Sequence, residues 1–217
     1  MAVADPGGLL EPIDLARFGP VIPVIVIDRL DHAVPMARAL VDGGVRVLEV
    51  TLRTAVALAA IEAIAREVPE AIVGAGTLRS AADVRSAHAA GARFGVSPGY
   101  SVSVAEACRG FGLPLLPGVA TATEVMQAAD DGFRFLKFFP ASAAGGTALL
   151  KAWASPFADI VFCPTGGVGI DSAPGWLALP NVKVVGGSWL TPAEALAAGD
   201  WNRVTRLARE ATALRKG

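Results

Sequence analysis

Residues 21–53, VIPVIVIDRLDHAVPMARALVDGGVRVLEVTLR, contain the unit whose rhythm continues through the rest of the chain. Two runs rich in β-branched residues, 21–27 and 47–53, flank an amphipathic segment at 31–42. Parallel strands need a crossover connection of about a dozen residues or more, usually a helix, so the stretch predicts a strand–helix–strand unit. The chain alternates in this way to its end, without a break in composition.

The whole chain is expected to contain eight such units. Strands are expected at 21–27, 47–53, 72–77, 93–98, 113–119, 133–139, 159–167 and 182–188. Helices are expected near 31–42, 56–67, 80–90, 101–109, 121–130, 145–153, 171–177, 192–197 and 200–214. This order predicts a single α/β domain over residues 1–217, a (β/α)8 TIM barrel, with residues 1–8 flexible. The stretch from Leu9 to Arg17 is expected to form an extra N-terminal helix that closes the bottom of the barrel.

An open, doubly wound sheet would show the same alternation and is the main competing fold. Such a sheet usually carries a glycine-rich phosphate fingerprint after its first strand. The segment that follows the first predicted strand here, IDRLDHAV, contains no glycine. The barrel is therefore favoured.

Composition excludes several kinds of partner. Lys and Arg number 19 against 20 Asp and Glu, and no basic run could follow a nucleic-acid backbone. The longest uncharged stretch, 110–123, contains two prolines and three glycines, so it predicts no membrane span. The N-terminus lacks the basic and apolar regions of a secretory signal.

Cys108 and Cys163 lie in apolar runs that are typical of buried thiols. A cytoplasmic protein is therefore expected. No metal centre is expected, because His32 and His88 are far apart in sequence and no cluster of possible ligands has the spacing of a metal site.

The strand at 47–53 places charged residues on one face. Alternation puts Val47, Glu49, Thr51 and Arg53 on one side, and the other side is apolar and suited to packing against helices. Glu49 and Arg53 would then point into the barrel interior, where charge is costly unless it is paired or functional. An internal ion pair between Glu49 and Arg53 is the structural alternative to a catalytic role.

Lys137 lies in the run FRFLKFF at 133–139, among phenylalanines. Desolvation in such a setting favours the neutral, nucleophilic amine of a Schiff-base lysine. Alternation places Phe133, Phe135, Lys137 and Phe139 on one face, so an inward face would bring Lys137 to Glu49 near the carboxyl ends of the strands, with Phe139 lining the pocket. Among the other lysines, Lys151 and Lys216 suit a solvated surface and Lys183 lies near the start of its strand. A surface lysine at a strand edge is the alternative interpretation of Lys137.

Glycine-rich segments end the last two predicted strands. CPTGGVG follows the seventh strand and GGS ends the eighth, the positions at which barrels of this kind commonly bind phosphate through backbone N–H groups. Ser188 adds a hydroxyl donor to the second segment. The pair predicts a phosphate site, and plain turns are the alternative.

Several segments together resemble the 2-keto-3-deoxy-6-phosphogluconate (KDPG) and 4-hydroxy-2-oxoglutarate (KHG) aldolases. They are PVIVIDRLDHAVPMARALVDGGVRVLEVTLRT, EVPEAIVGAGT, the SPG of VSPGY, FLKFFPA, FCPTGG and VGGSWL. The resemblance extends from about Gly19 to the C-terminus. It implies a (β/α)8 barrel, a homotrimer, no metal and no cofactor. The chain departs from the family at Asp28-Arg29, at Leu78-Arg79 and in the segment SAAGG.

The resemblance also implies roles for individual residues. Lys137 matches the Schiff-base lysine and Glu49 the general acid/base, while Arg53 and Thr77 match the positions that hold the pyruvate carboxylate. Pro98 and Phe139 match the family's apolar pocket walls. The residues that match the positions binding the substrate hydroxyl and phosphate are Thr165, Gly166, Gly167, Gly186, Gly187 and Ser188.

The implied activity is a metal-independent lyase of the Entner–Doudoroff pathway that cleaves a phosphorylated keto-deoxy sugar acid to pyruvate and glyceraldehyde 3-phosphate. Cleavage of KHG to pyruvate and glyoxylate is implied as well. The galactonate-derived epimer remains open as a substrate. A phosphate-gripping epimerase or decarboxylase without a Schiff base is a competing function, and so is a non-catalytic phosphosugar-binding barrel. The intact Lys137 and Glu49 argue against the non-catalytic barrel.

Overall fold

The strands form curled parallel sheets that follow the order of the chain. The structure, a computed structural model, describes residues 11–214. A six-stranded sheet has the order β5-β4-β3-β2-β1-β9, and a three-stranded sheet has the order β6-β7-β8. Every pairing within them is parallel. The strands are β1 (Val21–Ile25), β2 (Val47–Thr51), β3 (Ile72–Gly76), β4 (Gly95–Val96), β5 (Leu115–Leu116), β6 (Gly118–Val119), β7 (Phe135–Phe138), β8 (Val161–Pro164) and β9 (Val185–Gly187).

The two sheets meet on both sides. Strands β5 and β6 are consecutive parts of one extended segment that is interrupted at Pro117, whose carbonyl accepts a hydrogen bond from the Lys137 N–H. Proline has no N–H to donate to a ladder, which explains the break. On the other side, isolated parallel bridges join Thr165 to Gly186 and Phe162 to Val182. The sheet therefore curls around an interior.

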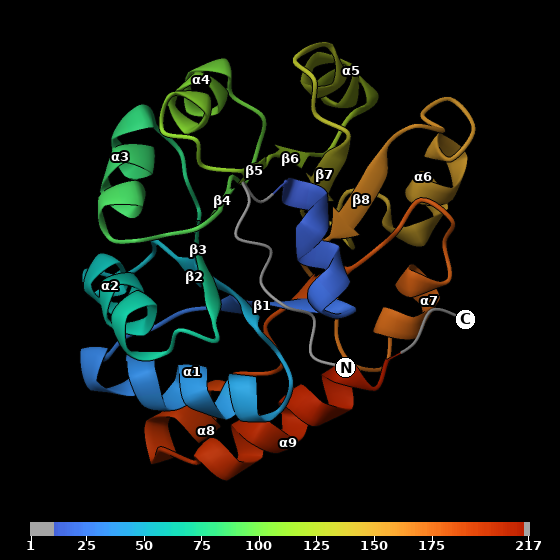
Figure 1. Ribbon diagram of the computed structural model, residues 1–217. Coiled ribbons are helices and arrows are strands. Elements are labelled where there is room, and N and C mark those ends of the chain that lie inside the picture. The colour runs from blue at the N-terminus through green and yellow to red at the C-terminus, as the bar shows by residue number, and fades with distance from the viewer. Residues whose placement is uncertain (1–10, 215–217) are drawn as a thin grey trace.

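Helices surround the strands, as Figure 1 shows. The α-helices are α1 (Ala33–Asp42), α2 (Ala57–Glu67), α3 (Ala81–Ala89), α4 (Val102–Gly110), α5 (Ala122–Asp130), α6 (Gly146–Trp153), α7 (Ala173–Leu177), α8 (Ala193–Ala198) and α9 (Trp201–Thr212). Side-chain caps define some of their starts: Ser80 and Asp200 each accept a backbone N–H, and Thr121 forms a capping box with Glu124. Within residues 11–214, no helix has the length and apolar character that a membrane span needs.

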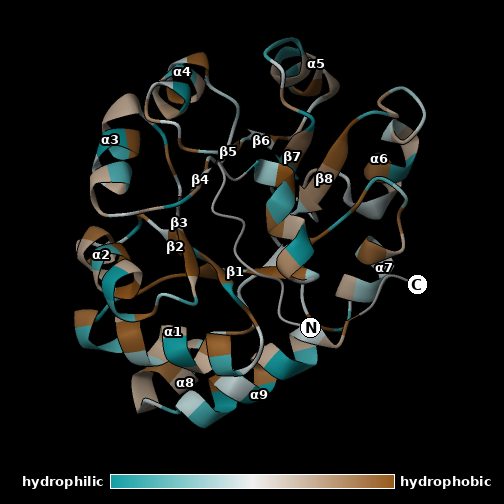
Figure 2. Cartoon of the chain, viewed as in Figure 1, coloured by the Kyte–Doolittle hydropathy of each residue, from teal (hydrophilic) through white to brown (hydrophobic). Residues whose placement is uncertain are grey.

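Side chains alternate between two apolar layers, as predicted. Val47 belongs to an interior cluster with Phe135, whereas Leu48 and Val50 belong to an outer cluster between strands and helices. Figure 2 shows the resulting pattern, with largely hydrophobic strands and helices that are banded hydrophobic and hydrophilic. The interior cluster consists of Leu15, Ile22, Val47, Ile72, Phe94, Val96, Leu116, Phe135, Cys163 and Val184.

A helical segment closes the N-terminal end of the interior. It is a 3₁₀ helix, η1 (Pro12–Phe18), which Figure 1 shows in blue inside the ring of helices. Its Leu15 is 1% exposed and packs in the interior cluster. The helix expected over 9–17 is thus present in its described part, but it begins at Pro12 and is of the 3₁₀ type. The flexibility expected for residues 1–8, and the starting residue Leu9, lie outside the described residues.

Most strands are shorter than predicted, and this changes the position of Phe133. The sixth predicted strand begins two residues late, at Phe135. Phe133 therefore precedes β7 and packs against the outer cluster, with its ring 6.2 Å from that of Tyr100. Placing Phe133 on the inward face was wrong, whereas Phe135 and Lys137 do share that face.

Candidate active site

An ion pair lies at the centre of the site. Lys137 in β7 places its Nζ 3.2 Å from Oε1 of Glu49 in β2, and the two side chains are 5% and 4% exposed. Because β2 and β7 belong to different sheets, the contact crosses the interior. Glu49 therefore pairs with Lys137 and not with Arg53, the partner considered as the structural alternative. An amine and a carboxylate at this distance are close enough to exchange a proton.

The strand register sets the depth of the pair. Val47 and Phe135 lie two residues earlier on the same strands, in the interior cluster. Glu49 and Lys137 therefore lie one layer nearer the carboxyl ends of the strands. In barrel enzymes the active site forms at this end.

Lys137 faces the interior and has an aromatic ring beside its amine. Its strand neighbours Leu136 and Phe138 point to the other face of β7, into the outer cluster. Phe139, directly after β7, places its ring centroid 5.3 Å from Lys137 Nζ, a distance suited to a cation–π contact. Lys137 is thus buried, as predicted, and not a surface lysine. Lys151 and Lys183 are exposed, and Lys216 lies outside the described part of the chain.

Arg53 and Thr77 meet at the rim of the site. The Arg53 Nε donates to Thr77 Oγ1 over 3.2 Å. Arg53 is exposed because β2 ends two residues earlier, at Thr51, so the expectation of a guanidinium in the interior layers was wrong. Thr77 has φ 65°, a left-handed conformation that is costly for a β-branched residue and that is found most often at functional sites.

The two glycine-rich strand ends lie side by side. Thr165, at the end of β8, bridges to Gly186 in β9, and a Cβ on Gly186 would lie 2.1 Å from Thr165 Oγ1. Gly166 and Gly167 have φ +98° and +74°, the region that favours glycine. Gly187 is held against the ring of Trp189, where a Cβ would lie 1.7 Å from a ring carbon. The two segments predicted to bind phosphate are therefore close enough to form one site.

Ser188 and Pro98 are placed at the same end of the strands. Ser188 is exposed and lines a cavity of about 760 Å³ together with Trp189 and His32. Pro98 follows β4 and is partly buried, and its carbonyl packs against Gly118, where a Cβ would lie 2.3 Å from the carbonyl oxygen. Glu49, Lys137 and Gly186 lie within their strands, and the other residues expected in the site are found at or just beyond the carboxyl end of a strand.

Three further residues at this end were not predicted. Gly76 packs directly against Glu49, Cys163 is the register partner of Lys137, and the Ser142 hydroxyl donates to the Gly167 carbonyl over 3.0 Å. The glycine at the end of the run IVGAG was the available signal for Gly76. The contact between Ser142 and Gly167 joins residues 25 positions apart, so no local pattern could reveal it.

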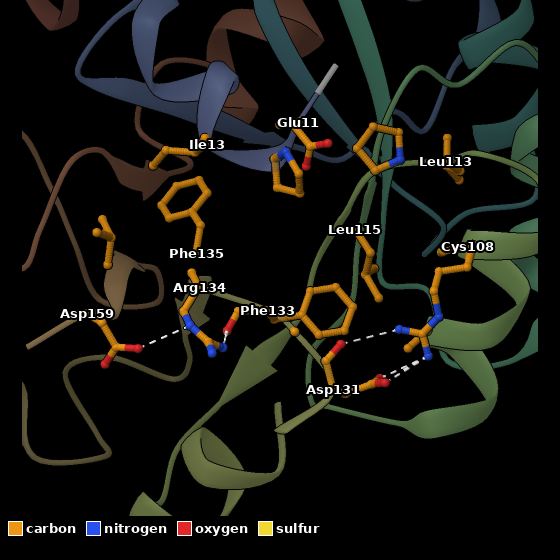
Figure 3. Close-up of a pocket in the computed structure, with 16 residues that line it drawn as sticks. Glu11, Ile13, Cys108, Leu113, Leu115, Asp131, Phe133, Arg134, Phe135 and Asp159 are labelled. Atoms are coloured by element: carbon orange, nitrogen blue, oxygen red, sulfur yellow. Dashed lines mark hydrogen bonds and ion pairs between the residues drawn. The ribbon is translucent and has the colours of Figure 1, made fainter. Parts of the chain in front are cut away.

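Another cavity lies at the opposite end of the strands. It has a volume of about 480 Å³ and is lined by η1 and by the starts of β5, β7 and β8. Two ion pairs lie in its lining, Arg109 with Asp131 at 2.9 Å and Arg134 with Asp159 at 3.1 Å. Figure 3 shows the pair of Arg134 and Asp159. This cavity lacks an arrangement like the Lys137–Glu49 pair. The part of the chain from 11 to 214 also contains no group of three or more His, Cys, Asp or Glu side chains that could hold a metal ion.

Comparison with known proteins identifies the family. A family model described as KDPG and KHG aldolase matches residues 13–207. The chain belongs to this family. Among its members, the 2-dehydro-3-deoxy-phosphogluconate aldolase of Dickeya dadantii is 55% identical over 195 residues, which cover 90% of this chain and 92% of that protein. The KHG/KDPG aldolase of Escherichia coli K12 is 54% identical over 193 residues, 89% and 91% of the two chains.

A solved structure of the family has the same fold. The KDPG aldolase of Legionella pneumophila, with pyruvate captured as a covalent carbinolamine, superimposes with a TM-score of 0.92. It is 43% identical, and the match covers 94% of this chain and 99% of that one. The family expected from the sequence is confirmed.

We predict that neither cysteine of this family member reacts quickly in the native state. Burial raises the pKa of Cys163 to about 12, although the Lys137 ammonium acts to lower it, and burial raises the pKa of Cys108 to about 11. At pH 8 about one thiol in a thousand or fewer would be the reactive thiolate. Titration with a chromogenic disulfide should find almost no fast-reacting thiol in the native protein and two after unfolding. A native thiol that reacts within seconds would contradict the buried environment of these residues.

Proposed function

We propose that the protein is a class I aldolase that cleaves KDPG to pyruvate and glyceraldehyde 3-phosphate, and KHG to pyruvate and glyoxylate. The observation that carries the proposal is the buried contact between Lys137 Nζ and Glu49 Oε1 at the carboxyl ends of the strands. Membership of the family supports it, as does the carbinolamine captured with pyruvate in the Legionella relative. A carbinolamine is the adduct that an amine forms when it attacks a ketone.

In the proposed reaction the neutral amine of Lys137 attacks the C2 ketone of the substrate. Loss of water from the carbinolamine gives an iminium ion, which serves as an electron sink. The Glu49 carboxylate takes the C4 hydroxyl proton and the C3–C4 bond breaks. The electron pair of that bond moves into the enamine, and the aldehyde leaves. The Glu49 carboxylic acid then returns the proton to C3, and hydrolysis of the iminium releases pyruvate and the amine.

Glu49 can also prepare the nucleophile. Its Oε1 lies 3.2 Å from Lys137 Nζ, so the carboxylate can accept the proton that the ammonium must lose before it attacks. Glu49 would give this proton to the carbinolamine hydroxyl as water leaves, and it is then a carboxylate again when it takes the C4 hydroxyl proton. The sheet provides this geometry before substrate arrives, so no side chain has to be recruited from elsewhere.

The rim residues would orient the substrate. Arg53 can bind both oxygens of the pyruvate carboxylate with its planar guanidinium, and Thr77, already hydrogen bonded to Arg53, would be the second donor. Phe139 and Pro98 would form the apolar walls around the three-carbon unit. Phosphate would bind at the glycine-rich end formed by Thr165, Gly166, Gly167, Gly186, Gly187 and Ser188.

We extend the proposal to the whole molecule. The parallel pairing, the bridges between β8 and β9 and the shared segment of β5 and β6 support a closed (β/α)8 barrel and a single domain. Catalysis by the Lys137–Glu49 pair needs no metal, and we propose a metal-independent enzyme. Two buried, unpaired cysteines fit a cytoplasmic location. A homotrimer is proposed from the family resemblance.

We predict that Glu49→Gln separates adduct formation from turnover. Borohydride with pyruvate should add one pyruvate-derived group per chain at Lys137 in the parent enzyme, and the variant should still form this adduct at a measurable rate. Turnover of KDPG should fall by about 10² to 10⁴, because Gln cannot transfer the proton. Peptide mapping and a coupled assay give the two readouts. An adduct on Lys183, or none in the parent enzyme, would exclude the aldolase, and near-parent turnover of the variant would make Glu49 structural.

We predict that Ser188→Ala discriminates between the two substrates. Loss of a hydrogen bond to a charged group costs roughly 1.5 to 3 kcal/mol, so kcat/KM for KDPG should fall about 10- to 100-fold. The value for KHG, which has no phosphate, should change little. Ser86→Ala, at an exposed position in α3, is the control and should leave both values unchanged. Equal losses on the two substrates would mean that the glycine-rich ends are only turns.

A further inference from the structure

Gly76, the last residue of β3, packs directly against the side chain of Glu49. An ideal Cβ on Gly76 would lie 2.3 Å from Oε1, 2.7 Å from Cγ and 2.9 Å from Cδ of Glu49. Real Cβ atoms essentially never approach heavy atoms this closely. All three contacts are with Glu49, so the missing side chain of Gly76 is the space that Glu49 fills.

Space, and not backbone freedom, is what this glycine provides. Gly76 is absent from the glycines that have a positive φ. It pairs in regular parallel register with Thr51, and its carbonyl accepts the Leu52 N–H over 2.9 Å. An alanine could therefore adopt the same backbone conformation. The cost of an added methyl group would fall on Glu49.

Glu49 has no simple way to avoid such a methyl group. A clash with Oε1 alone could be relieved by rotating the end of the side chain, but the contacts with Cγ and Cδ require the whole side chain to shift. The Glu49 side chain is 4% exposed, and close-packed interiors leave little room for such a shift. Any shift that clears the methyl group changes the 3.2 Å contact with Lys137 Nζ.

We propose that Gly76 is a positioning residue for the acid/base Glu49, and that it acts by leaving the space in which the carboxylate faces Lys137. This inference rests on the proposed function of Glu49. Gly76 itself transfers no proton and touches no reacting atom. Its role predicts a larger loss in kcat, where Glu49 must move protons to and from the substrate, than in the capture of pyruvate by Lys137.

The first experiment compares Gly76→Ala with Gly95→Ala. Gly95, in the neighbouring strand β4, is also buried, and a Cβ there would lie 2.5 Å from the methyl Cδ1 of Leu78, in the outer cluster. Gly76→Ala should lower kcat for KDPG about 100-fold, since a misplacement of about 1 Å can cost that much. Borohydride trapping of pyruvate at Lys137 should remain measurable, as predicted for Glu49→Gln. Gly95→Ala should keep kcat within a few-fold of the parent enzyme.

A second experiment keeps the proposal testable if Gly76→Ala folds poorly. Glu49→Ala removes Cγ, Cδ and Oε1, the three atoms that the added methyl group would meet. Gly76→Ala should therefore lower the Tm of the parent protein but leave the Tm of the Glu49→Ala protein almost unchanged. Such non-additivity is the signature of two residues that act through direct contact. Equal Tm losses in the two backgrounds would overturn the proposal.

The outcomes also separate this inference from the proposed function. If Glu49→Ala keeps near-parent turnover, the role proposed for Glu49 fails. If Glu49→Ala loses turnover while Gly76→Ala keeps it, Glu49 retains its role and only the positioning by Gly76 is contradicted. A loss of turnover in Gly76→Ala together with a relieved Tm in the double variant supports both.

Discussion

The contact between the Lys137 ammonium and the Glu49 carboxylate is the interaction on which the rest of the site depends. It joins β2 and β7 across the interior, so it exists only because the parallel sheet curls far enough to bring these strands face to face. Removing two charges from water costs several kcal/mol for each ion, and the attraction between them often does no more than offset this. The pair is therefore better explained by chemistry than by stability.

Glycines supply the space that this arrangement needs. Gly76 leaves room for Glu49, and Gly186 leaves room for the Thr165 hydroxyl. Gly187 leaves room for the Trp189 ring, which packs against the glycine backbone. Each lies at the carboxyl end of a strand, where side chains from several strands converge. The glycines of this end thus have two roles. Some, such as Gly166, provide a turn with positive φ, and others provide space for a neighbouring side chain.

Alternation along the strands was enough to predict the faces of Glu49 and Lys137, because side-chain direction in a strand is a local property. Alternation placed Lys137 near Glu49, but it could not decide between Lys137 and Arg53 as the ionic partner of Glu49. Arg53 is far closer to Glu49 in sequence than Lys137 is, but β2 ends at Thr51 and leaves Arg53 at the exposed rim. Phe133 was misplaced for the same reason, since β7 begins at Phe135. Strand ends depend on pairing with neighbouring strands. The contacts of Gly76 and Ser142 depend on which strands lie side by side and in what register, which no local pattern encodes.

The most direct test of this account is the free energy of unfolding, measured by urea denaturation, of a Lys137→Met, Glu49→Leu double variant. Replacing a buried ion pair by apolar side chains of similar volume is often neutral or stabilising by about 1 to 4 kcal/mol. If the pair is kept for catalysis, the double variant should be at least as stable as the parent protein although it has lost aldolase activity. A loss of about 3 kcal/mol or more in the double variant would contradict the account, because it would show that the fold itself requires the pair.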